Sequence, residues 1–149
     1  MAMRKKIKSF KTIEEKLDCI SKFLDSKKAD KLLQVDVQES TALCDYFVIA
    51  SANNSTQVKA MSEGLEEELS KKYGVEPKCR EGVKDGQWAV LDYGDIIVHI
   101  LLQEVRTQYD MDSLWVNEKN TVNYTELAEA LAIEKRKARL AKIKQQEEN

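Results

Sequence analysis

Two aspartates and the only histidine of the chain lie close together in the stretch WAVLDYGDIIVHI, residues 88–100. Asp92 and Asp95 flank a Tyr-Gly pair, and His99 follows four residues after the second carboxylate. Paired aspartates hold Mg²⁺ in phosphoryl-transfer enzymes. One hypothesis is therefore a metal-dependent nucleotidyltransferase or phosphohydrolase that uses Asp92 and Asp95.

The rest of the sequence gives little support to an enzyme. No third acidic residue stands at a characteristic spacing from the pair, and no glycine-rich phosphate loop or GxSxG elbow is present. The three cysteines, Cys19, Cys44 and Cys79, are too far apart to predict a zinc site. We expect them to be buried free thiols in a reducing cytosol. The sequence thus predicts no catalytic residue, metal or cofactor.

The same stretch predicts a β-hairpin with a two-residue turn at Tyr93–Gly94. Because side chains alternate along a strand, the register places three pairs on one face of the sheet. These pairs are Asp92 with Asp95, Val90 with Ile97, and Trp88 with His99. The opposite face, predicted to be core, carries Ala89, Leu91, Ile96, Val98 and Ile100.

The Trp88 face has two further interpretations. Trp88 and His99 could be ordinary packing partners, with the aspartates as solvated turn residues. Alternatively, an aromatic and aliphatic face with a charged rim has the composition of a protein-binding site. Four other side chains add to the second interpretation: Tyr46, Tyr109, Leu114 and Trp115.

Hydrophobic spacing and turn residues predict the elements that position this hairpin. We expect helices over 12–27, from Asn54 to Gly74 and over 124–144, a short helix or turn over 104–115, and a disordered end at 145–149. We expect strands over 32–37, 45–51 and, at a sheet edge, 75–82. The order predicts a single α/β domain with a mixed β-sheet flanked by helices, over 1–115, and a helical, partly disordered C-terminal extension over 116–149.

The charge distribution bears on the partner. Residues 1–31 carry a net charge of +5, residues 32–115 carry −8, and residues 116–149 carry +1. An acidic middle segment repels nucleic acid and attracts basic proteins. The sequence contains no apolar run long enough for a membrane span and no signal-peptide pattern, so we expect a cytoplasmic protein without a membrane contact.

Three separated motifs resemble a known family. DYFVIA at 45–50, WAVLDYGD at 88–95 with VHI at 98–100, and YDMDSLW at 109–115 occur in the order found in the ribosomal silencing factors, the RsfS/Iojap family. The resemblance covers about residues 16–115. Many relatives end soon after the LW pair, whereas this chain continues for 34 residues past Trp115.

The resemblance implies a non-enzymatic homodimer with a nucleotidyltransferase-like topology but no small-molecule substrate. It implies binding to the large ribosomal subunit through the fourteenth protein of that subunit, which blocks subunit joining and represses translation under nutrient limitation. The docking residues would be Trp88 and Tyr93 as anchors, Asp92 and Asp95 as acidic partners, and Tyr109, Leu114 and Trp115 around them. Asp45, Tyr46 and His99 would support these residues. The resemblance says nothing about the basic extension; we expect it to be solvated with weak contact to ribosomal RNA, and packing on a dimer partner is the alternative.

Overall fold

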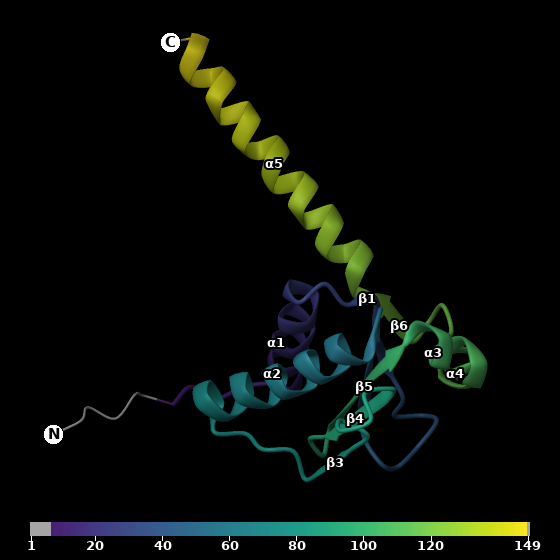
Figure 1. Ribbon diagram of the computed structural model, residues 1–149. Helices are drawn as coiled ribbons and strands as arrows, with labels where there is room; N and C mark the ends of the chain where they lie inside the picture. Colours follow the sequence, from purple (N-terminus) through teal and green to yellow (C-terminus); the bar gives the residue numbers. More distant parts are fainter. Residues whose placement is uncertain (1–6, 149) are drawn as a thin grey trace, which may run out of the picture.

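The computed structural model describes residues 7–148, which form five helices and six strands among the described residues (Figure 1). The elements are α1 (Ile13–Ser26), β1 (Asp30–Asp36), β2 (Tyr46–Ala52), α2 (Ser55–Tyr73), β3 (Cys79–Glu81), β4 (Trp88–Asp92), β5 (Ile96–Leu102), α3 (Gln103–Tyr109), α4 (Met111–Trp115), β6 (Thr121–Asn123) and α5 (Tyr124–Glu148). The predicted α/β class is confirmed.

The six strands form one mixed sheet in the order β3-β4-β5-β2-β1-β6. β2 and β5 run parallel at the centre, and the other paired strands of the described chain are antiparallel. The crossover from β2 to β5 passes through α2, β3 and β4. Central strands are buried on both faces, which explains the nearly continuous apolar run of β2.

Helices α1 and α2 cover one face of the sheet (Figure 1). Each helix begins at a side-chain cap: Thr12 accepts from the Glu15 N–H at 3.1 Å, and Asn54 accepts from the Gln57 N–H at 2.8 Å. α2 ends at Gly74, whose φ of 65° is favourable for glycine. The predicted buried stripe of α2 is confirmed and consists of Val58, Met61, Leu65 and Leu69.

The other face is covered only in part, by α3 and α4. Its smaller hydrophobic cluster includes Leu33, Val35, Phe47, Ile49, Leu101 and Met111. Trp88, Ile97 and Trp115 pack on this cluster but stay half-buried. One face of the sheet therefore supplies the larger core, and the opposite face leaves apolar side chains within reach of a partner.

The turn of the β4–β5 hairpin differs from the prediction by one residue. The Tyr93 N–H donates to the Ile96 carbonyl at 2.9 Å, so the turn residues are Gly94 and Asp95. Trp88 therefore lies opposite Leu101 and Asp92 opposite Ile97. This two-residue change in pairing keeps each strand residue on its predicted face, and the five predicted core residues are all fully buried.

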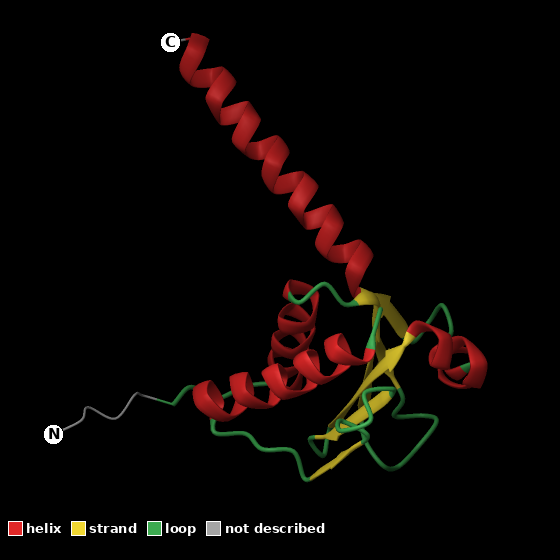
Figure 2. Ribbon diagram, in the orientation of Figure 1, coloured by secondary structure: helices red, strands yellow, loops and turns green. Residues whose placement is uncertain are grey.

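The C-terminal segment contains a strand that the sequence did not predict. β6 pairs with β1, with Gln34 opposite Val122, so the sheet extends beyond Trp115. α5 then leaves the domain as a single projecting helix (Figure 2). Residues 145–148, for which the sequence predicts disorder, continue the helix in this structure; Asn149 lies outside the described residues. Within 7–148, no helix has the length and apolarity needed to cross a membrane.

Candidate functional site

Trp88 and His99 lie on the partly covered face and are hydrogen-bonded to each other. The Trp88 indole N–H donates to His99 Nδ1 at 3.1 Å. His99 is therefore the neutral tautomer that carries its proton on Nε2. Burial lowers the pKa of His99 to about 4, and its Nε2 has no hydrogen-bond partner among the described residues. At neutral pH the histidine orients the indole and does not carry charge.

An aromatic cluster extends from this pair across the sheet to α3 and α4. Phe47 of β2 contacts the His99 ring edge-on at 4.8 Å and the Trp115 ring at 4.9 Å. Trp88 contacts Tyr109 of α3, with ring centroids 5.5 Å apart. The two edge-to-face contacts of Phe47 each contribute about 0.5–1.5 kcal/mol beyond the area that they bury. β2, β4, β5, α3 and α4 thus present one connected aromatic surface.

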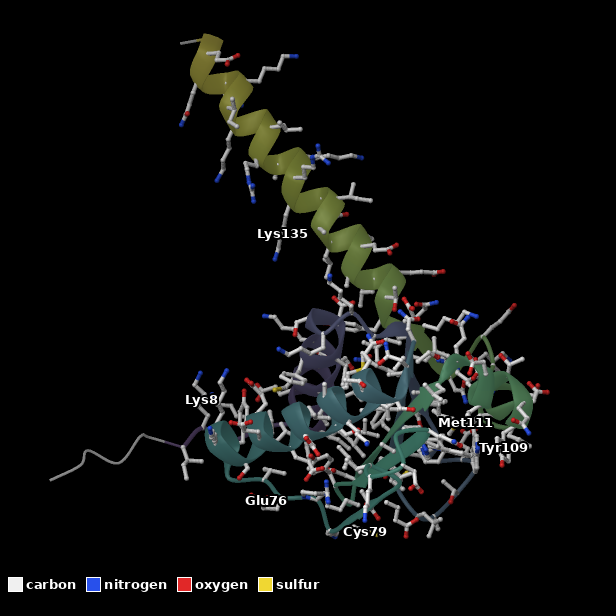
Figure 3. All side chains as sticks on the ribbon, in the orientation of Figure 1. Lys8, Glu76, Cys79, Tyr109, Met111 and Lys135 are labelled. Carbon is white, nitrogen blue, oxygen red and sulfur yellow. The ribbon has the colours of Figure 1, made fainter. Side chains whose placement is uncertain are left out.

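Large apolar side chains of α3 and α4 are exposed beside this cluster. Tyr109 is 60% exposed and Leu114 is 73% exposed. Figure 3 shows Tyr109 beside Met111 at the α3–α4 end of the molecule, away from α1 and α2. Exposed apolar groups next to half-buried aromatics are typical of a protein-binding surface.

Arg106 holds α3 and α4 against the sheet. Its guanidinium donates to both carboxylate oxygens of Asp112 at 2.9 and 3.0 Å, and to the Lys31 carbonyl and Ser51 Oγ at 2.8 Å each. The arginine side chain is only 6% exposed. This bidentate pair connects the two short helices to the ends of β1 and β2, and so positions Tyr109 and Leu114.

Tyr93 does not lie on this surface, which corrects the prediction that it is an anchor. Its side chain is 5% exposed and belongs to the core beneath α1 and α2. Burial raises the pKa of Tyr93, and its hydroxyl has no hydrogen-bond partner within the described chain. Because Tyr93 continues the alternation of Ala89 and Leu91, it faces away from Trp88.

The two aspartates point to different sides of the hairpin. Asp92 lies on the Trp88 face, half-buried, and accepts the Gly94 N–H at 2.8 Å. Asp95 forms an ion pair with Lys16 of α1 at 2.7 Å, on the helix-covered side. The predicted pairing of the two carboxylates on one face is therefore wrong, and Asp95 already has a cationic partner. Asp92 alone remains on the aromatic surface.

The supporting residues Asp45 and Tyr46 also differ in position. The Asp45 and Tyr46 N–H groups both donate to the Asp95 carbonyl, at 2.9 and 3.1 Å, so these residues fix the turn through their backbone. The Tyr46 side chain packs against the helix-covered core. Burial raises the pKa of the Tyr46 hydroxyl. The Tyr46 side chain therefore does not belong to the aromatic surface.

The cysteines and acidic residues form no metal centre in 7–148, where no group of three or more potential ligands is close enough to hold an ion. Cys44 is buried as predicted, and burial together with Asp92 raises its pKa to about 11. Cys19 is half-buried and Cys79 is exposed on the edge strand β3. The prediction of buried thiols therefore holds for Cys44 and is wrong for Cys79.

Phe47 and Arg106 belong to this site but were absent from the predicted set. Phe47 could have been found from the alternation of β2, since it shares a face with Ile49. Arg106 is a single arginine in a short helix, and nothing in its local sequence shows that it is buried.

Comparison with known proteins identifies the family. A family model described as "Ribosomal silencing factor during starvation" matches residues 10–149. The chain belongs to the RsfS family. The match includes the sheet, the aromatic surface and α5. The family consists of non-enzymatic ribosome-binding regulators, so the hypothesis of an enzyme acting through Asp92 and Asp95 is not retained.

Individual relatives agree with this assignment. The chain is 32% identical over 96 residues to the ribosomal silencing factor RsfS of Chromobacterium violaceum, an alignment that covers 64% of this chain and 78% of the relative. It is 30% identical over 91 residues to RsfS of Bacillus subtilis, covering 61% and 76%. A crystal structure of a Chromobacterium violaceum protein superposes with a TM-score of 0.68 at 30% identity, covering 72% of this chain and 89% of that one.

Proposed function

We propose that this RsfS-family chain binds the fourteenth protein of the large ribosomal subunit through the aromatic surface formed by Trp88, Tyr109, Leu114 and Trp115. The bound factor would cover a surface needed for joining of the small subunit and would repress translation when nutrients are scarce. The observation that carries the proposal is the connected aromatic cluster with an exposed apolar rim.

The charge of the domain supports a basic partner. The segment 32–115, which contains this surface, has a net charge of −8. Asp92 lies on the same face as Trp88, and Glu81 of the neighbouring edge strand lies opposite Val90 on that face. Ribosomal proteins are typically basic, and such complementarity increases the association rate and orients the encounter. Lys16 neutralises Asp95 within the chain, so we assign the acidic role to Asp92.

Leu114→Ala is the sharpest test because Leu114 is 73% exposed, and its truncation removes little internal packing. Purified protein is sedimented with isolated large subunits, and subunit joining is measured in parallel. A central contact costs about 2 kcal/mol on truncation, which corresponds to about thirtyfold weaker binding. Leu131→Ala on α5, where the leucine is 49% exposed and lies outside the site, is the matched control and should bind normally.

Trp88→Ala is expected to weaken binding at least as strongly, with joining restored in the same assay. Its unfolding is measured separately, because the indole also packs on His99 and Tyr109. If both Leu114→Ala and Trp88→Ala bind large subunits normally, the site assignment is wrong. If the wild-type chain does not bind large subunits, the proposed function is wrong.

A homodimer remains a prediction that rests on the family resemblance, and a cytoplasmic location remains a prediction that rests on the sequence pattern. The dimer is tested by sedimentation velocity over a range of protein concentrations. If Trp88→Ala converts a dimer into a monomer, the aromatic surface is a self-association site, and any effect on ribosome binding is indirect.

A further inference from the structure

The outer part of α5 has a composition unlike that of the remaining surface. Residues 135–144 contain six Lys/Arg and no Asp/Glu; these are Lys135, Arg136, Lys137, Arg139, Lys142 and Lys144. Within the described chain none of the six takes part in a salt bridge, and all are exposed. We call this segment the basic arm. Among the described residues, this charge has no ion-pair partner.

Contacts with the domain fix the first turns of α5 and so set the direction in which the basic arm projects. β6 pairs with β1 immediately before the helix, and Thr125 Oγ1 accepts the Leu32 N–H at 3.0 Å. The first turns contact β1 and α1. A helix of 25 residues is about 37 Å long, so the arm stands well clear of the acidic domain. Figure 3 shows Lys135 on this projecting part of the helix.

The pattern of the arm favours a polyanion over a second copy of the chain. Leu127 and Leu131 lie on one side of α5, while Ile133 and Leu140 lie roughly opposite at 100° per residue. α5 therefore has no continuous apolar stripe of the kind that pairs helices in a coiled coil. By contrast, Lys135, Arg139 and Lys142 follow the i, i+4, i+7 spacing and share one face.

We propose that the basic arm binds the phosphate backbone of ribosomal RNA while the aromatic surface binds a ribosomal protein. This inference rests on the proposed function and extends it to a second contact. Lysine and arginine on a helix neutralise phosphates without reading bases, and the deep, narrow major groove of A-form RNA excludes base readout. The contact is therefore independent of RNA sequence and dependent on salt.

The test compares the wild-type chain with Lys135→Gln/Arg139→Gln/Lys142→Gln. Binding is measured by fluorescence anisotropy to an A-form RNA hairpin and by co-sedimentation with large subunits, between about 50 and about 200 mM salt. The logarithm of the binding constant falls linearly with the logarithm of the salt concentration, and loss of three phosphate contacts makes this slope less steep by about 2 to 3. Between these two salt concentrations the affinity of the wild-type chain should therefore fall about fortyfold more than the affinity of the variant.

Two controls isolate the arm. Lys135→Arg/Arg139→Lys/Lys142→Arg keeps the charge and should keep the wild-type slope. Lys22→Gln/Lys59→Gln/Lys84→Gln removes the same charge from exposed positions of the domain and should change the slope far less. Circular dichroism checks that each variant retains its helix content.

The outcomes separate this inference from the proposed function. An unchanged salt slope on both RNA and subunits would overturn the arm contact, while binding that depends on Leu114 would still stand. If the glutamine variant instead loses concentration-dependent dimerisation, the arm binds a second copy and the RNA assignment is wrong. RNA-hairpin binding tests the arm even if the wild-type chain fails to bind subunits.

Discussion

Replacement of Arg106 by methionine should destabilise the domain through the loss of one buried hydrogen-bond network. The change removes both bonds to Asp112 and leaves the Lys31 carbonyl and Ser51 Oγ without their donor. A buried acceptor left unsatisfied costs about 1–3 kcal/mol. Asp112 is 42% exposed, so water solvates the carboxylate left behind and its contribution is small.

Ser51 Oγ is buried and the Lys31 carbonyl is only partly buried, so the expected loss in the free energy of unfolding is about 2–3 kcal/mol. Urea unfolding measures it, followed by circular dichroism and by the fluorescence of Trp88 and Trp115, which both lie on the affected face. For a chain of this size the loss lowers the Tm by about 10 °C.

The matched control is Arg80→Met, which removes a partly exposed ion pair with Glu66 at 3.0 Å. Exposed pairs contribute about 0–1 kcal/mol, so this variant should remain close to wild type. If Arg106→Met costs no more than Arg80→Met, the network does not hold α3 and α4 in place. The position of Leu114 would then need another explanation.

Three further predictions concern single side chains. Burial lowers the folded-state pKa of His99 from 6.5 to about 4. The free energy of unfolding should therefore be highest above pH 6.5 and should fall by about 3 kcal/mol as the pH is lowered toward 4. The variant His99→Phe titrates in neither state, so its urea unfolding should lack this pH-dependent loss. Ellman's reagent should modify the exposed Cys79 in the native protein and the buried Cys44 only after unfolding, whereas equal rates would contradict the described burial. Gly82→Ala should lose several kcal/mol, since the added Cβ would lie 1.9 Å from the Trp88 carbonyl oxygen at a φ of 73°; a wild-type urea midpoint would refute this.

The parts of the fold with a strong periodic signal were predictable. The buried stripe of α2 and both faces of β4 follow from spacing alone, because burial selects apolar residues at a fixed period. The turn was less predictable, since its register depends on Gly94 and on distant N–H groups that bind the Asp95 carbonyl. β6 has three residues and pairs only because β1 offers an open edge.

The site was predictable in composition and less so in geometry. Trp88, Tyr109 and Trp115 were identified as aromatic residues of one region, and the structure brings their rings together through Phe47. Tyr93 was misplaced because it was assigned to the turn, although the alternation of Ala89 and Leu91 already pointed it into the core. Pairing of Asp95 with Lys16 joins residues 79 positions apart, which no local pattern reveals.

The order of strands has a consequence for how the chain folds during synthesis. The central parallel pair joins Tyr46 to Ile96, and the β1 edge is completed only when Asn123 pairs with Leu33. Contacts this distant in sequence slow folding, because the loop must close before any pairing is gained. The edge of β2 that pairs with β5, and the face of β1 and β2 that packs against Met111 and Trp115, therefore stay uncovered until most of the chain has been made. The chain should therefore be most prone to aggregation between the synthesis of β2 and the synthesis of β5, and a chain truncated before β5 should be insoluble.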